Sequence, residues 1–114
     1  MVEPLQYKPI IEKLFKKTQA DRVPWEAQGD SVFHCQLEEY RFSIRATKSG
    51  FSLTMKDSRY NEIFSVTIEE EIYFSDAEKQ ETFQMLSDLY ELARRRALNV
   101  PEKLVGVAEL LDRI

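Results

Sequence analysis

The sequence predicts an α+β fold: a four-stranded antiparallel meander with one face covered by helices, in the order α-β-β-β-β-α-α. Four short runs in the middle of the chain alternate apolar and polar residues with a period of two, which is typical of half-buried strands. Three other segments repeat apolar residues at spacings of three and four, which indicates amphipathic helices. A sheet with one apolar face needs a cover, and we expect these helices to provide it. The 114 residues suffice for a single domain, 1–114, with one core.

The first helix is predicted over about residues 8–20, with Pro9 in its first turn, where the missing N–H costs no hydrogen bond. Residues 21–29 form a connector that contains the only tryptophan, Trp25, and we expect its ring to fill one end of the core. The links between the following strands are short, so consecutive strands are antiparallel neighbours, because a parallel crossover needs a dozen residues or more. The four strands are predicted at 32–37, 40–46, 51–56 and 64–68.

The longest periodic segment, residues 75–98, predicts the central helix of the fold. Ser75 and Glu78 have the spacing of a capping box at its start. Asn99 is expected to end the helix in a left-handed conformation, and a third helix follows at 101–113. The stripe of the central helix that we expect on the sheet consists of Phe83, Leu86, Tyr90, Ala93 and Ala97. The inner face of the third helix consists of Leu104, Val107, Ala108 and Leu111, and Ile114 can extend it.

Composition excludes several classes of protein. No apolar run approaches the ~20 residues of a membrane-spanning helix, and the N-terminus lacks the pattern of a signal peptide, so we expect a cytoplasmic protein. Cys35 is the only cysteine, which excludes an internal disulfide and a zinc site built from several cysteines. With three scattered glycines, the chain has no phosphate-binding loop of the usual spellings.

No catalytic or metal-binding constellation is visible in the sequence. His34 and Cys35 cannot form a nucleophile–base pair, because adjacent residues on a strand point to opposite faces. A metal site would have to use carboxylates, and the acids at residues 69–76 are expected simply to border the start of a helix. We therefore predict no catalytic residue, no metal and no cofactor. Two distant carboxylates that converge in space, as in a hydrolase, stay open as an alternative.

The candidate functional surface is the polar face of the sheet, together with the acidic side of the central helix. The sheet face is rich in small hydroxyls and mildly basic, whereas the helix side is acidic. Either surface can simply face solvent, and the alternative is that it binds a partner protein or a second copy of the chain. The residues assigned to this partner surface are Arg41, Ser43, Arg45, Thr54, Lys56, Glu78, Glu81 and Asp88.

Nucleic acid is not the expected partner. The net charge of −4 disfavours attraction to phosphates. Proteins that bind single strands place aromatic side chains among their cations, and here Tyr40, Phe42 and Phe51 are predicted on the core side of the sheet.

Several landmarks together resemble a family of small bacterial proteins with no assigned function. They are the leading helix with Leu14, Phe15 and Thr18, the Val-Pro-Trp-Glu connector at 23–26, the meander, the LYxxARRxAL pattern at 89–98, and Glu-Lys-Leu at 102–104. The resemblance spans nearly the full chain. It implies a bacterial cytoplasmic protein with an α+β order, and it implies no functional residues.

The first functional hypothesis is a non-catalytic protein-interaction module, small and acidic. The alternative is a small-ligand-binding or hydrolytic protein with a site between the sheet and the helices, lined by Trp25, Tyr73 and Tyr90. Aromatic residues in such places more often bury their rings in the core. A deep pocket with converging polar groups would favour the alternative.

Overall fold

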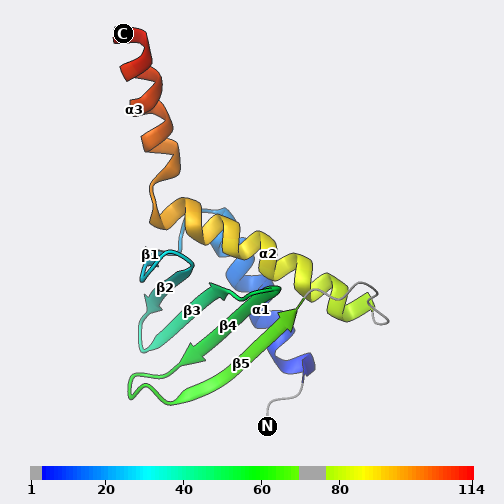
Figure 1. The fold of residues 1–114 in the computed structure, drawn as a ribbon. Helices are drawn as coiled ribbons and strands as arrows, with labels where there is room; N and C mark the ends of the chain where they lie inside the picture. Colours follow the sequence, from blue (N-terminus) through cyan, green and yellow to red (C-terminus); the bar gives the residue numbers. More distant parts are fainter. Residues whose placement is uncertain (1–3, 70–76) are drawn as a thin grey trace.

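A computed structural model describes residues 4–69 and 77–114, which form one antiparallel sheet and three helices (Figure 1). The α+β class and the antiparallel sheet that the sequence predicts are confirmed. The elements are α1 (Pro4–Gln19), β1 (Glu26–Ala27), β2 (Val32–Leu37), β3 (Tyr40–Ala46), β4 (Gly50–Lys56), β5 (Glu62–Glu69), α2 (Ala77–Ala97) and α3 (Val100–Arg113).

The sheet has five strands rather than the predicted four, so the order is corrected to α-β-β-β-β-β-α-α. Each strand pairs with the next along the chain, as expected for a meander. The additional strand, β1, lies in the connector, where Glu26 is opposite His34 and Ala27 is opposite Phe33. At two residues, β1 is too short for an alternation of apolar and polar positions to reveal it.

Helix α1 begins four residues before its predicted start, so Pro9 lies inside the helix rather than in its first turn. A proline at this place removes one backbone hydrogen bond. Burial of Ile11, Leu14 and Thr18 on the inner side of α1 offsets that loss.

The inner face of the sheet, α1 and α2 share one core. Helix α2 crosses the sheet and contacts all five strands, while α1 packs beside α2 (Figure 1). Leu86 and Ala93 have no exposed surface, which confirms that this stripe meets the sheet. The rings of Phe83 and Tyr90 both pack against Phe51, with centroids 5.7 and 5.3 Å apart. The sheet contributes Phe33, Cys35, Phe42, Ile44, Leu53, Phe64 and Val66 to this core.

Trp25 lies at one end of the core, as predicted, and is 3% exposed. Its indole Nε1 donates a hydrogen bond to the Thr18 hydroxyl at 3.1 Å. That hydroxyl in turn donates to the Leu14 carbonyl oxygen at 2.8 Å. Both buried polar groups therefore have hydrogen-bond partners, and these bonds hold the connector against α1.

Helix α3 does not cover the sheet. It leaves the end of α2 and projects away from the rest of the fold (Figure 1), and none of its residues is buried. The predicted inner face is therefore wrong: Leu104, Val107 and Leu111 are each more than half exposed, and Ala108 is exposed as well. Asn99 is left-handed as predicted, with φ 53° and ψ 45°, and redirects the chain at a point where α1 and α2 already occupy the inner face of the sheet.

Some predictions fall on residues that the structure does not describe. Ser75 of the predicted capping box, Tyr73 and most of the acids at 69–76 lie outside the described ranges, as does the side chain of Glu78. Within those ranges, none of the helices combines the length and the apolar character needed to span a bilayer.

Candidate interaction surfaces

The face of the sheet opposite α1 and α2 is hollowed into an open depression of about 660 Å³, the outer-face depression. Small hydroxyl side chains of β3, β4 and β5 form its floor, because they occupy facing positions on adjacent strands. Two pairs are hydrogen-bonded: Thr54 Oγ1 and Ser65 Oγ are 3.1 Å apart, and Thr67 Oγ1 donates to Ser52 Oγ at 3.0 Å. The depression is lined by Gln28, Val32, Arg41, Ser43, Arg45, Ser52, Thr54, Lys56, Tyr60, Glu62, Ser65 and Thr67.

Three cationic side chains surround these hydroxyls. The Arg41 guanidinium lies over the ring of Tyr60, 5.3 Å from its centroid. Lys56 is opposite Glu62 in the register of β4 and β5. Arg45 is exposed, and within the described ranges its guanidinium has no hydrogen-bond or ion-pair partner. Among the described residues, the lining contains three cations and the single acid Glu62, so this lining carries a net positive charge.

The structure brings together all five sheet residues that the sequence assigns to the partner surface, namely Arg41, Ser43, Arg45, Thr54 and Lys56. It does not bring the helix residues to them. Glu81 and Asp88 are exposed on α2, in the layer on the other side of the sheet. The Glu81 carboxylate pairs with Lys8 Nζ at 3.3 Å, and Asp88 Oδ1 accepts a hydrogen bond from Gln84 Nε2 at 3.0 Å. The predicted surface is therefore two separate surfaces.

Seven residues of the depression are missing from the set assigned to the partner surface: Gln28, Val32, Ser52, Tyr60, Glu62, Ser65 and Thr67. Alternation counted back from Ser65 assigns Ile63, not Glu62, to the polar face. An irregularity between Met55 and Lys56 shifts the register there and pairs Glu62 with Lys56. A bulge adds one residue to a strand, so a strict period of two cannot anticipate it.

His34 lies between Glu26 and Ser43 in the register of β1, β2 and β3. A serine, a histidine and an acid are the residue types of a nucleophilic hydrolase. Within the described ranges, however, no side-chain hydrogen bond joins His34 to either neighbour. Glu26, His34 and Ser43 therefore lack the chain of hydrogen bonds that activates a nucleophile.

Cys35 points to the core, opposite to His34, as the strand periodicity predicts. Burial raises the pKa of its thiol to about 12, and the opposing effect of a backbone hydrogen bond with Phe42 is smaller. The thiol is therefore protonated at neutral pH and behaves as a small apolar residue.

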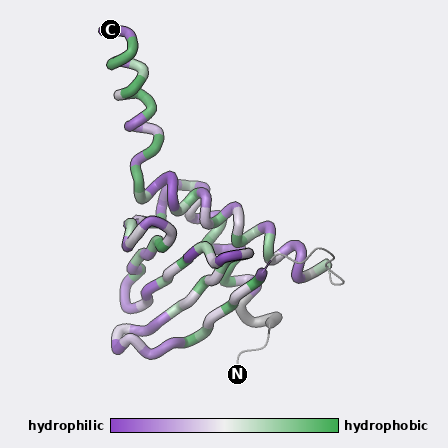
Figure 2. Tube along the Cα trace, viewed as in Figure 1, coloured by the Kyte–Doolittle hydropathy of each residue, from purple (hydrophilic) through white to green (hydrophobic). Residues whose placement is uncertain are grey.

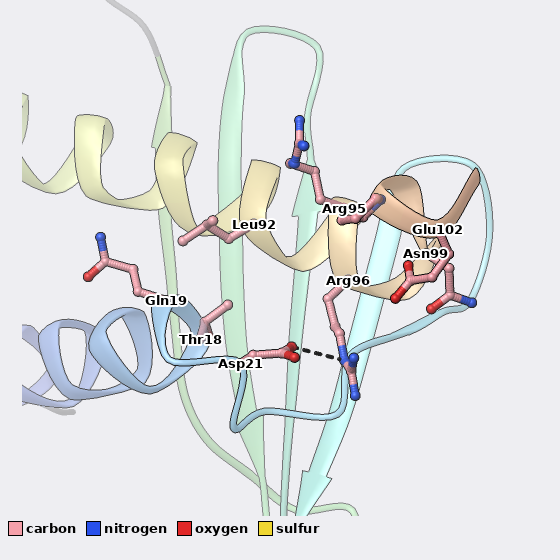
Figure 3. Close-up of a pocket in the computed structure, with 9 residues that line it drawn as sticks. Thr18, Gln19, Asp21, Leu92, Arg95, Arg96, Asn99 and Glu102 are labelled. Atoms are coloured by element: carbon pink, nitrogen blue, oxygen red, sulfur yellow. Dashed lines mark ion pairs between the residues drawn. The ribbon is translucent and has the colours of Figure 1, made fainter. Parts of the chain in front are cut away.

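A smaller cavity of about 210 Å³ lies at the elbow between α2 and α3, beside the end of α1 (Figure 3). Asp21 Oδ1 and Arg96 Nε form an ion pair across it at 3.4 Å, with both side chains more than a third exposed. An exposed pair of this kind contributes at most about 1 kcal/mol. The cavity is also below the ~300 Å³ at which ligand pockets begin. We interpret it as the junction that orients α3.

The third distinctive surface is α3 itself. Figure 2 shows hydrophobic residues recurring along its whole length, although the helix has no cover. Six of the nine large apolar residues that are exposed in the described ranges belong to α3 or directly follow it: Leu104, Val105, Val107, Leu110, Leu111 and Ile114. An apolar face of this extent on a helix normally marks an interaction site.

Two of the three residues named for a pocket between sheet and helices, Trp25 and Tyr90, pack within the core, and Tyr73 lies outside the described ranges. Trp25 is fastened to Thr18, and the Tyr90 ring packs against Phe33 and Phe51 at 5.4 and 5.3 Å between centroids. Within residues 4–69 and 77–114, no group of three histidine, cysteine, aspartate or glutamate side chains is placed to hold a metal ion.

Comparison with protein-family models, with curated proteins and with solved structures finds no match for this chain. The resemblance to a family of small bacterial proteins therefore stays a prediction. A function is therefore inferred from the chemistry of the surfaces and not from the fold.

Proposed function

We propose that this protein is a non-catalytic interaction module of the bacterial cytoplasm, which binds an acidic segment of a partner protein in the outer-face depression. One observation carries the proposal: three cations surround a floor of hydroxyls on the sheet face opposite the helices. A polar face that served only to contact water would not need its cations grouped around a hollow.

The chemistry of the depression favours carboxylates. The Arg45 guanidinium offers a planar, bidentate donor for a carboxylate, and Lys56 adds a second positive charge. The neighbouring serine and threonine hydroxyls can donate further hydrogen bonds. Because the lining is net positive, two copies placed face to face would bring like charges together, so an acidic partner fits this surface better than a second copy.

Single-stranded nucleic acid fits the depression less well than an acidic protein segment. Stacking of bases requires open aromatic faces among the cations. Tyr60 is the single aromatic residue that the described part of the chain contributes to the lining, and the Arg41 guanidinium already lies over its ring.

The test is affinity capture of partners from a nuclease-treated host lysate with the tagged protein. The variant is Arg41→Glu/Arg45→Glu, which reverses two charges of the depression. The matched control is Lys13→Glu/Lys79→Glu, which changes the net charge equally at two exposed positions on the helices of the other layer. Circular dichroism and a thermal melt verify that all three proteins are folded.

We expect the parent and the control to retain the same partner, with at least tenfold less retained by Arg41→Glu/Arg45→Glu. Washing at high salt should release the partner, because exposed charge pairs are screened. Equal retention by all three proteins would contradict the proposal. So would a partner that is captured from untreated lysate and is absent after nuclease treatment.

A further inference from the structure

Helix α3 carries an apolar seam with the spacing of a coiled coil. Val100, Leu104, Val107, Leu111 and Ile114 recur at alternating spacings of four and three, which is the period of 3.5 that keeps a seam facing a partner helix. Leu104 is 59% exposed, Leu111 64% and Ile114 89%. The seam is therefore complete in the sequence. In the structure it is open from Leu104 to Ile114, whereas Val100 at the start of the helix is half-buried.

This helix has little to hold it by itself. It has 14 residues, and helices of about 12–15 residues are marginal in water. Gly106 in its interior lowers helix stability by up to about 1 kcal/mol relative to alanine. A short helix that buries none of its residues gains stability when its apolar face is covered.

The flanks of the seam fit a second copy of the same helix. The residues directly beside it include Lys103, Ala108 and Leu110. No acid borders the seam, so two identical helices can approach without repulsion between carboxylates. Pairing of α3 also leaves the charged side of each helix in water. That side carries Glu102, Glu109, Asp112 and Arg113.

A membrane surface fits α3 less well. Helices that lie on membranes usually carry lysine and arginine on their polar side, where they meet anionic lipid. The charged residues of α3 are three acids and two bases. The helix therefore has the apolar face of a membrane-surface helix without the matching charge.

We propose that α3 pairs with α3 of a second copy, so that the protein self-associates through a two-helix seam. Because α3 projects away from the sheet, a second helix can lie along its length of about 21 Å (Figure 1). Burying an aliphatic side chain removes about 60–120 Å² from water, so the five seam residues of each copy bury about 600–1,200 Å² together. Stable interfaces begin at about 1,200 Å², so the association is weak and depends on concentration.

The test is sedimentation equilibrium of the full chain between about 1 and 500 µM. Leu104→Glu/Leu111→Glu places two charges in the seam. The matched control, Gly106→Glu/Arg113→Gln, makes the same net charge change seven residues apart on the opposite side of α3. Gly106 has open space around its Cβ position, so the control introduces no clash.

We expect the parent and the control to reach twice the mass of one chain as concentration rises. The dissociation constant of the Leu104→Glu/Leu111→Glu variant should be at least tenfold higher than that of the parent. Thermal melts should show that this variant keeps its core, since α3 contributes no buried residue. A parent that stays monomeric at 500 µM contradicts the proposal. If this monomer co-sediments with phosphatidylglycerol vesicles in a separate experiment, α3 binds a membrane surface and the proposal is wrong. Equal association of parent and seam variant contradicts it as well.

Self-association through α3 is independent of binding in the outer-face depression. Arg41→Glu/Arg45→Glu leaves the seam intact and should associate as the parent does. If that variant alone becomes monomeric, the contact between copies lies on the sheet, and the pairing of α3 is wrong.

Discussion

Helices α2 and α3 follow each other in the chain with Leu98 and Asn99 between them, and both carry an apolar stripe, yet they end in opposite environments. Leu86, Leu89 and Ala93 of α2 have no exposed surface, whereas no residue of α3 is buried. The periodicity of the sequence indicates that a helix has an apolar side. It does not indicate which surface covers that side, because this depends on where the other elements pack.

Truncation of a leucine to alanine should have very different consequences in these two helices. Leu86→Ala should lower the free energy of unfolding by about 2–5 kcal/mol, because it leaves a cavity in a packed core. Leu111→Ala should change it by no more than about 0.5 kcal/mol in dilute solution, because the side chain is already exposed. Urea melts at low protein concentration measure both values. Similar losses for the two variants would mean that α3 belongs to the core.

The same comparison shows how far the sequence predicts the fold. Strands β2 to β5 and helix α2 were predictable because one side of each is buried in the same core, which imposes the period of the element on its residues. Strand β1 was not, because two residues carry no period. The direction of α3 was not predictable either, since it depends on Asn99 and on the occupation of the sheet by α1 and α2.

The outer-face depression was partly predictable for a related reason. The regular alternation of β3 and β4 identifies the five sheet residues assigned to the partner surface. Glu62 required knowledge of the irregularity at Met55 and Lys56, and Gln28 and Tyr60 lie in loops that have no period. Glu81 and Asp88 were assigned by charge alone, which does not tell the two sides of the fold apart.

Gly50 in the sheet and Gly106 in α3 have different surroundings. A Cβ on Gly50 would collide with the Ile68 carbonyl oxygen on the neighbouring strand, so Gly50→Ala should cost about 1–3 kcal/mol in a urea melt. Gly106→Ala meets nothing and should stabilise α3 by up to about 1 kcal/mol, seen as stronger helical circular dichroism without a change in the melting midpoint. A harmless Gly50→Ala would mean that β4 and β5 are not closely paired there.

A small dependence of stability on pH is expected from Asp57, in the turn between β4 and β5. A hydrogen bond from the Asn61 backbone N–H, with further ones from the Asn61 side chain and the Arg59 N–H, holds the pKa of Asp57 below its ordinary value of 3.8. The charged carboxylate therefore stabilises the fold above pH 3.8, and this contribution is lost as the pH falls through the lower folded-state pKa.

The parent should accordingly be slightly more stable than Asp57→Asn at neutral pH. This advantage should shrink below pH 3.8 in urea melts taken from about pH 6 to pH 2. An advantage that is the same at pH 2 and pH 6 would contradict a role for the Asp57 charge.

The central claim is that the core ends with α2 and that α3 is stabilised only when it pairs with a second copy. The most direct test is hydrogen exchange, measured for each residue by NMR at two protein concentrations. In dilute solution, we predict slow exchange for the amides of α2, near the limit set by global unfolding, and fast exchange for those of α3. Raising the concentration should slow exchange in α3 and leave α2 unchanged. Protection of α3 equal to that of α2 in dilute solution would contradict the account.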